Sequence, residues 1–185
     1  MDQSTMNDRM STYTGLRFCP LDMKPEDVRL EDIAHALSLL CRGGGHLKYF
    51  YSVGQHCINC AAEAAARGWS GRVVLACLLH DASEAYISDI IRPVKKHLTN
   101  YVEIEDGILK VIFVHFGLDE ITQEEWIQVR RIDDEILAHE LKQLLCGDWE
   151  GTLPVLYAVP DLSCRDVREI EERYQKVYET IHEKI

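Results

Sequence analysis

The chain has 185 residues, of which 46% are hydrophobic and 28% charged, a length and composition typical of one globular domain with one core. Its formal net charge of −11 opposes binding to a polymeric nucleic acid, because such proteins need a basic face to neutralise phosphates. No apolar run approaches the roughly 18 residues of a membrane span, and the first residues do not resemble a signal peptide. We expect one cytoplasmic domain over residues 1–185, with no membrane contact and with residues 1–10 as a flexible N-terminus.

Seven cysteines, an odd number, are scattered along the chain at positions 19, 41, 57, 60, 77, 146 and 164. Most lie in apolar helical patterns, where a free cysteine behaves as a small hydrophobic residue, so no disulfide framework is expected. Cys57 and Cys60 form a CxxC, a spacing that zinc and redox sites use. No second CxxC follows, and we interpret this pair as structural.

The N-terminal half predicts one extended segment followed by helices. Residues 11–30 mix glycine, proline and aromatic residues, which suits a short extended segment or hairpin and confines β structure to this region. Apolar spacing from Glu31 predicts a helix that the glycines at 43–45 interrupt. A second helix is predicted at 52–67, ended by Gly68, and a third at 71–86, whose apolar run at 73–79 indicates burial on nearly all sides.

The C-terminal half continues the helical pattern. Pro93 limits the next element, and a helix is predicted at 101–116, closed by Gly117. Thr122 and Glu125 form a capping-box pattern at the start of a helix over 122–145. A loop at 147–164 then leads to a final amphipathic helix from Arg165. The fold prediction is therefore all-α, a compact bundle of about six helices with a short extended N-terminal segment.

The adjacent pair His80 and Asp81 is the sharpest chemical feature, because imidazole nitrogen and carboxylate oxygen both bind first-row divalent metals. Neighbouring residues of a helix point about 100° apart, so an ion at that edge can receive both. Glu84 lies four residues after His80, on the same face of the predicted helix. There its carboxylate can accept a proton from a water that a metal activates. His56, near the start of an apolar helix, is the best third ligand, and one further carboxylate is needed.

These motifs resemble the HD-domain phosphohydrolases, in which a histidine, a His-Asp pair and a distant aspartate bind the metal. The likeness covers most of the chain, and its specific part is HDASEAY followed by D-x-x-x-P-V-K. Further stretches that resemble the branch of 5′-deoxynucleotidases and phage dATP triphosphohydrolases are TYTGLRFCPL, DIAHALSLLCRGGGH, FYSVGQHC and VRRIDDEILAHE. The resemblance implies a compact HD-domain helical bundle.

The resemblance also implies which side chains bind the metal and water. The four protein ligands would be His56, His80, Asp81 and Asp133, with Asp134 as the alternative to Asp133, and Glu84 would position or deprotonate the attacking water. One divalent transition metal is expected, and Mn, Co, Fe, Ni and Zn all suit two histidines and two aspartates. Mg²⁺ is an additional candidate at the substrate phosphates.

Four further residues are candidates for substrate binding. Arg42 stands where relatives have an arginine that contacts phosphate, which a guanidinium matches with two parallel hydrogen bonds. Asp89 resembles a position near the sugar, whereas His46 and Lys95 are candidates for contacts with the phosphate or leaving oxygen. Gly43 stands where many relatives carry a bulky aromatic residue after this arginine, so the ring is missing or is supplied elsewhere. The remaining histidines are interpreted as structural or surface residues.

The resemblance implies hydrolysis of a small nucleotide, most plausibly a deoxynucleotide, either by removal of a 5′-monophosphate or by release of triphosphate. Two alternatives stay open: a noncatalytic HD module that binds a nucleotide as a sensor, and a hydrolase of cyclic dinucleotides or guanosine tetraphosphate. The metal ligands together with Glu84 favour an enzyme. A homodimer or larger homo-oligomer is expected from the family.

Overall fold

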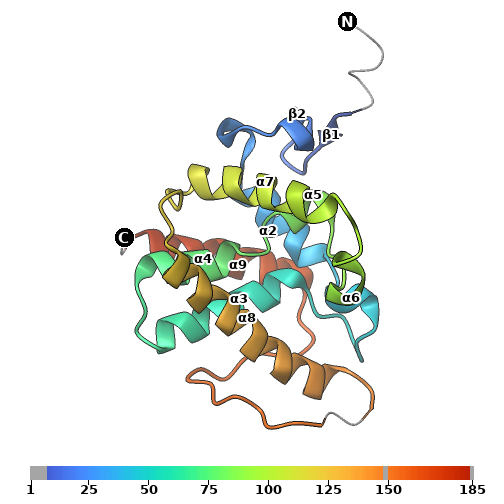
Figure 1. Cartoon of the computed structure of the whole chain (residues 1–185), viewed down its shortest axis with the longest axis vertical. Coiled ribbons are helices and arrows are strands. Elements are labelled where there is room, and N and C mark those ends of the chain that lie inside the picture. The colour runs from blue at the N-terminus through green and yellow to red at the C-terminus, as the bar shows by residue number, and fades with distance from the viewer. Residues whose placement is uncertain (1–7, 148–149, 184–185) are drawn as a thin grey trace, which may run out of the picture.

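A computed structural model describes residues 8–147 and 150–183. Most of the N-terminus that was expected to be flexible, residues 1–7, lies outside this part of the chain. Met10 already belongs to a strand: β1 (Met10–Ser11) pairs antiparallel with β2 (Arg17–Phe18), and Met10 lies opposite Phe18. The short hairpin predicted for this region is confirmed, and it projects from one end of the molecule (Figure 1).

The fold is all-α, as predicted. The six longest helices of the described chain are α2 (Leu30–Leu39), α3 (Val53–Ala66), α4 (Gly71–Leu79), α7 (Tyr101–His115), α8 (Gln123–Leu144) and α9 (Val167–His182). Shorter turns of helix are α5 (Glu84–Ile87), α6 (Arg92–Lys95) and the 3-10 turns η1 (Pro20–Asp22), η2 (Pro25–Asp27) and η3 (Arg42–Gly45). No helix among the described residues has the length and apolar character needed to cross a membrane.

Local hydrogen bonds explain where several helices begin. The hydroxyls of Ser52 and Ser70 accept hydrogen bonds from backbone N–H groups in the first turns of α3 and α4. Thr122 and Glu125 satisfy each other's free N–H groups at the start of α8, which is the predicted capping box. These caps fix the ends of the helices that carry the site described below.

The predicted third helix is shorter than expected. It ends at Leu79, and the chain then makes tight turns in which Ala82 N–H donates to the Leu79 carbonyl and Glu84 N–H to the Asp81 carbonyl. The ring of His80 helps to end the helix, because its Nδ1 lies 2.8 Å from the Cys77 carbonyl oxygen in the last turn. The prediction that Glu84 follows His80 on one continuous helix face was therefore wrong, and a turn places Glu84 instead.

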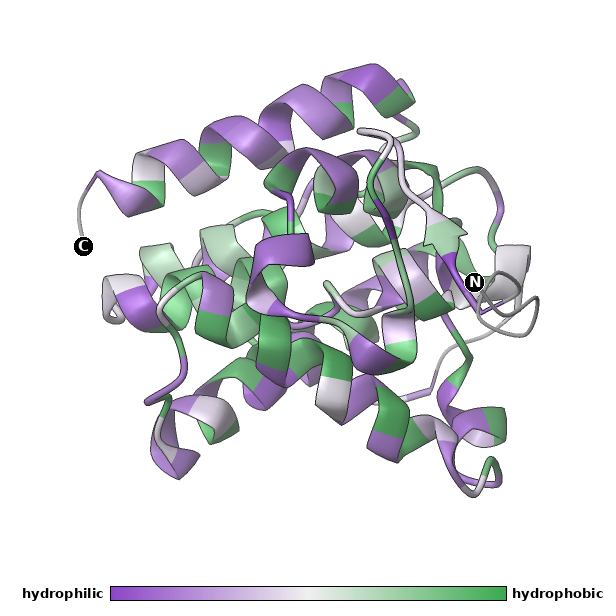
Figure 2. Ribbon diagram, turned by 90° about the horizontal axis from the view of Figure 1, so that it is seen from above, coloured by the Kyte–Doolittle hydropathy of each residue, from purple (hydrophilic) through white to green (hydrophobic). Residues whose placement is uncertain are grey.

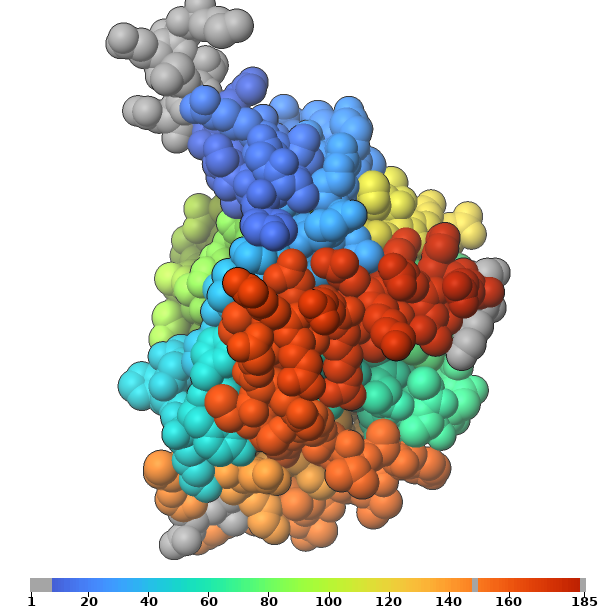
Figure 3. Space-filling view, turned by 180° about the vertical axis from the view of Figure 1, so that it is seen from behind, coloured from blue at the N-terminus to red at the C-terminus, as the bar shows by residue number. Residues whose placement is uncertain are grey.

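The helices α3 and α4 pack against each other and form the centre of the bundle. Each of these helices packs against both α8 and α9, and α2 packs on α3 and α9. The predicted burial of α4 is confirmed, since every side chain from Val73 to Leu79 is buried. Figure 2 shows α9 as a largely hydrophilic outer helix, and Figure 3 shows it lying across one face of the molecule. The core thus surrounds the helices that supply His56 and the His80–Asp81 turn.

Candidate metal centre

The four predicted metal ligands meet in one cluster, although they come from three separate elements. His56 lies on α3, Asp133 on α8, and His80 and Asp81 in the turn after α4. Their facing atoms are Nε2 of both histidines, Oδ2 of Asp81 and Oδ1 of Asp133, and five of the six pairs are 3.2 to 3.9 Å apart. Bond lengths of about 2.0–2.2 Å to one ion place its ligand atoms at about this separation. The arrangement suits a single divalent metal.

The cluster lies at the inner end of a cleft. The side chain of His56 is fully buried, whereas those of Asp81 and Asp133 are 19% and 17% exposed. Burial opposes their ionisation, but the nearby histidines and arginine hold the pKa of Asp81, and the histidines that of Asp133, below the usual range. Both carboxylates are therefore ionised at neutral pH and attract a cation.

Hydrogen bonds to the outer ring nitrogens orient both imidazoles. Nδ1 of His56 is 2.6 Å from Oε1 of Glu140, and Nδ1 of His80 is 2.8 Å from the Cys77 carbonyl oxygen. Because these acceptors require a proton on Nδ1, Nε2 of each neutral ring is left with a free lone pair. Burial lowers the pKa of His80, but the Asp81 carboxylate raises it well above its ordinary value. Metal binding must displace such protons.

Cysteine side chains lie against the same cluster, and two sets of donors are close enough to hold a metal ion: His56, Cys60 and His80, and Cys57, His80 and Asp81. The thiol of Cys60 is 3.5 Å from Nε2 of His56 and 4.0 Å from Nδ1, so it lies beside the ring rather than beyond its tip. Burial raises the pKa of Cys57 to about 11 and raises the pKa of Cys60 well above its ordinary value. In the metal-free protein both thiols are therefore protonated, and a metal bound through sulfur would have to displace that proton.

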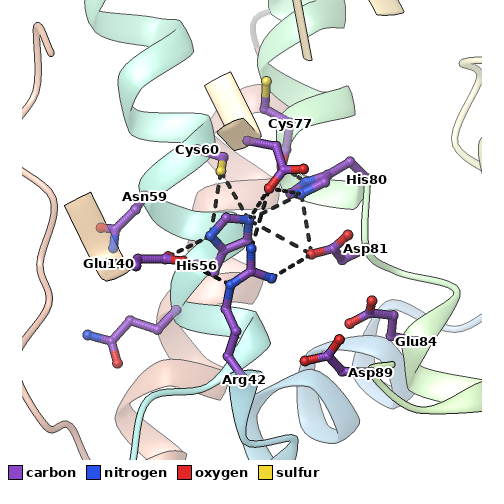
Figure 4. A network of polar contacts seen from close by, with 12 residues as sticks. Arg42, His56, Asn59, Cys60, Cys77, His80, Asp81, Glu84, Asp89 and Glu140 are labelled. Carbon is purple, nitrogen blue, oxygen red and sulfur yellow. Dashed lines mark hydrogen bonds and ion pairs between the residues drawn. The ribbon is translucent and has the colours of Figure 1, made fainter. Parts of the chain in front are cut away.

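Glu140 is a part of the cluster that the sequence analysis missed. Its Oε1 faces His56, while its Oε2 accepts from Nε of Arg42 at 2.9 Å (Figure 4). Oε1 also accepts from the Tyr51 hydroxyl at 2.8 Å. Burial raises the pKa of Glu140, but His56 and Arg42 outweigh it and hold the pKa at about 2. The available signal was spacing, because Glu140 follows Asp133 by about two helical turns on α8.

Arg42 lies against the carboxylates of Asp81 and Asp133. Its Nη1 is 3.2 Å from Oδ2 of Asp81 and its Nη2 is 3.4 Å from Oδ1 of Asp133. The Arg42 side chain is only 13% exposed. Arg42 is the first residue of η3 and lines the cleft. Both terminal nitrogens thus face the place where a metal and a phosphate would meet.

Asp133 and Asp134 have different partners. Asp133 uses Oδ1 toward His56 and Oδ2 toward Arg92, whereas Asp134 is 64% exposed and binds only the other Nη of Arg92, at 2.6 Å. Of these two neighbours, Asp133 therefore directs an oxygen toward the histidines and Asp134 does not. Arg92 is a second residue missed from the sequence; it belongs to the RPVK turn from which only Lys95 was selected.

Glu84 lies in the cleft beside Asp81 (Figure 4). It is 3% exposed, and its Oε2 has no hydrogen-bond partner among the described residues. Burial, together with the charges of Asp81 and Asp89, raises the pKa of Glu84 to about 9. Lys95 faces it with Nζ 3.6 Å from Oε1, and the same Nζ is 2.7 Å from Glu105.

The remaining predicted contacts divide into two groups. Asp89 lines the cleft and accepts a hydrogen bond of 3.1 Å from the Gly43 N–H, so its carboxylate also holds the glycine loop. Gly43 and Gly44 have φ angles of 64° and 62°, a left-handed conformation that favours glycine. His46 is exposed at the end of η3 and does not line the cleft. The prediction that His46 contacts substrate therefore has no support in this arrangement.

The cleft has a volume of about 400 Å³ and is lined by both charged and aliphatic side chains. The charged lining residues are Arg42, Asp81, Glu84, Asp89, Arg92, Lys95 and Asp133. The apolar lining residues are Ile90, Ile91, Pro93, Leu137 and Leu141. None of the described residues that line the cleft is aromatic, so the ring missing at Gly43 is not supplied by another lining residue.

Comparison with known proteins gives relatives over most of the chain. No family model matches the sequence. The uncharacterized protein YfdR of Escherichia coli (strain K12) is 34% identical over 152 residues, which cover 82% of this chain and 80% of YfdR. The uncharacterized protein RCAP_rcc00048 of Rhodobacter capsulatus is 32% identical over 154 residues, covering 80% of this chain and 78% of the relative. At this identity and coverage, the chain belongs to the same protein family as YfdR and RCAP_rcc00048.

Proposed function

We propose that the chain is a metal-dependent phosphohydrolase of the HD type that acts on nucleotides. The observation that carries this proposal is the convergence of Nε2 of His56, Nε2 of His80 and one oxygen each of Asp81 and Asp133. A cluster that only stabilised the fold would not need two imidazoles that present free lone pairs to one point. The resemblance of the motifs to HD phosphohydrolases supports the same conclusion.

His56, His80, Asp81 and Asp133 would hold one divalent transition metal. Such an ion supplies Lewis-acid chemistry, because it lowers the pKa of water and polarises a phosphoryl oxygen. The nitrogen and oxygen donors fit Mn, Co, Fe, Ni or Zn. In this proposal the thiols of Cys57 and Cys60 lie beside the metal without binding it, and the histidines and aspartates are the ligands.

Glu84 is the residue that would accept the proton of the attacking water. It is buried in the cleft, and its Oε2 is free of other partners, as a general base requires. A base must also be ionised, whereas burial, together with repulsion from Asp81 and Asp89, favours the protonated form of Glu84. A cation held by the neighbouring aspartates would lower the pKa of Glu84.

Arg42 and the cleft account for binding of a phosphate ester. Arg42 turns two guanidinium nitrogens toward the ligand oxygens, a geometry that suits a phosphate bound beside the metal. Lys95 adds positive charge next to Glu84. The aliphatic walls of the cleft would take the less polar part of the substrate, for which a nucleoside is the proposed group.

The test is a screen of the purified protein against nucleoside mono- and triphosphates with Mn²⁺, Co²⁺, Mg²⁺ and Zn²⁺, in which released phosphate and triphosphate are identified separately. Glu84→Gln should keep metal affinity and lose most turnover, because the amide cannot accept the proton. Glu103→Gln, an exposed change on α7, is the matched control and should remain active. A fully active Glu84→Gln enzyme would show that the proposed base is wrong.

The same screen separates an enzyme from a sensor module. A noncatalytic module would bind metal and a nucleotide without releasing phosphate from any substrate. Equilibrium binding of the nucleotides, measured beside turnover, would then show affinity with no product. That result would replace the proposed phosphohydrolase with the binding function.

A further inference from the structure

The carboxylate of Glu140 connects residues with two different roles in the proposed function. Oε1 lies 2.6 Å from Nδ1 of His56, a proposed metal ligand, and Oε2 accepts from Nε of Arg42, the proposed phosphate contact, at 2.9 Å. The side chain is 4% exposed. No other described residue contacts the outer nitrogen of His56 and the guanidinium of Arg42 with two oxygens of one side chain.

We propose that Glu140 is a positioning residue that fixes the metal-binding tautomer of His56 and, with its second oxygen, the direction of Arg42. This inference rests on the proposed function, because it assigns Glu140 a role in the same site. It means that metal affinity and phosphate affinity depend on one buried side chain that touches neither the metal nor the phosphate.

The hydrogen-bond chemistry requires a carboxylate at this position. Both partners, Nδ1–H of His56 and Nε–H of Arg42, are donors, so both Glu140 oxygens must accept. A glutamine of the same shape offers one oxygen and one NH₂ group. If its NH₂ faced Arg42, two donors would meet. If its NH₂ faced His56, Nδ1 would become the acceptor, and the proton would move to Nε2, where it blocks the metal.

His80 shows why the effect is confined to His56. Nδ1 of His80 is bound to the backbone carbonyl oxygen of Cys77 at 2.8 Å. No side-chain substitution removes that acceptor, so the tautomer of His80 is set by the fold. The tautomer of His56 depends on the Glu140 side chain. One substitution should therefore alter one imidazole and leave the other as a reference within the same protein.

A buried hydrogen-bond network also contacts Glu140. The Tyr51 hydroxyl donates to Oε1, and the amide nitrogen of Asn59 donates to the Tyr51 oxygen at 3.0 Å. Asn59 also bonds the backbone of Asp161 through both its nitrogen and its oxygen. Tyr51→Phe removes one hydrogen bond to Glu140 without removing an acceptor from His56 or Arg42. It is the matched control for loss of a buried hydrogen bond.

The experiment compares wild type, Glu140→Gln and Tyr51→Phe by Zn²⁺ titration, by ¹⁵N NMR of the histidine rings, and by thermal unfolding. In Glu140→Gln we expect Zn²⁺ affinity to fall by about 10- to 100-fold, the range for loss of a partner that orients a ligand histidine. Tyr51→Phe should lower the unfolding temperature with little change in Zn²⁺ affinity. If a nucleotide substrate is found, KM should also rise in Glu140→Gln, because Arg42 loses its support.

The outcomes separate the inference from the proposed function. If wild type binds no Zn²⁺ or other divalent metal, the proposed function fails, whereas the NMR spectrum of the metal-free protein still reports whether neutral His56 carries its proton on Nδ1. If Glu140→Gln binds Zn²⁺ as wild type does, Glu140 has only a structural role and the inference is wrong. Should Glu140→Gln not fold, the wild-type spectrum decides: a proton on Nε2 of His56 would overturn the inference.

Discussion

Nε2 of His56 and Nε2 of His80 lie 3.3 Å apart, although 24 positions and a helical hairpin separate the two residues. Two protonated rings would repel each other at this distance, and two neutral rings would bring lone pairs together. A cation between the nitrogens removes both problems. A proton shared between the two nitrogens would do the same, and the predictions below follow from how the surrounding residues complete this arrangement.

Asp133→Asn and Asp134→Asn should differ in metal affinity, although the residues are neighbours. Only Asp133 directs an oxygen toward the histidine cluster, whereas Asp134 binds Arg92 at the surface. We expect Asp133→Asn to weaken metal binding by on the order of 100-fold or more, since loss of an outer partner alone costs about 10- to 100-fold. Isothermal titration with Mn²⁺ or Zn²⁺ measures this. Equal losses in both variants would contradict the assignment of the fourth ligand.

Cys60→Ala should leave metal affinity nearly unchanged. The thiol lies beside the His56 ring, and burial raises its pKa well above the ordinary value. The Co²⁺-loaded wild type should accordingly lack the near-ultraviolet charge-transfer absorption of a cobalt thiolate. The appearance of that band in wild type, and its loss in Cys60→Ala, would instead assign the sulfur as a ligand.

The metal-free protein should lose stability in acid partly through Glu140. Its folded-state pKa of about 2 is below the value of about 4.3 for an unfolded glutamate. The corresponding stabilisation is present above pH ~4.3 and is lost as the pH falls toward 2, and it is on the order of 3 kcal/mol.

Urea unfolding in the presence of a chelator, between pH 6 and 2.5, measures this contribution. Glu140→Gln lacks the titrating group, so the difference in free energy of unfolding between wild type and variant should shrink as the pH falls. A difference that stays constant over this range would show that the ionised carboxylate does not stabilise the fold.

Gly54→Ala and Gly107→Ala should have opposite effects on stability. A Cβ at Gly54 would lie 3.2 Å from the carbonyl carbon of Leu37, where α3 crosses α2, whereas a Cβ at Gly107 meets nothing within 4 Å. We expect Gly54→Ala to cost about 1–3 kcal/mol through this backbone contact. Gly107→Ala should add about 0.5–1 kcal/mol, the helix preference of alanine over glycine. Chemical denaturation of the two variants beside wild type checks both signs.

Sequence patterns predicted the helices because their information is local. Apolar spacing, the Thr122 and Glu125 cap and glycines such as Gly68 and Gly117 act within a few residues, and α3, α7 and α8 lie close to their predicted bounds. The end of α4 was missed. There the His80 ring faces a carbonyl oxygen of its own helix, and the apolar run that precedes it gives no sign of this contact.

The sequence by itself determined that the fold is helical, and it singled out His56, His80, Asp81 and Glu84 as candidates for metal chemistry from residue type, spacing and motif resemblance. Only the tertiary structure decided between Asp133 and Asp134, since the rotation of α8 against α3 sets which carboxylate faces the histidines. It alone brought Glu140 and Arg92 to the cluster and left His46 outside the cleft. Such contacts join residues far apart in the chain, and they depend on how whole helices pack, which no local pattern records.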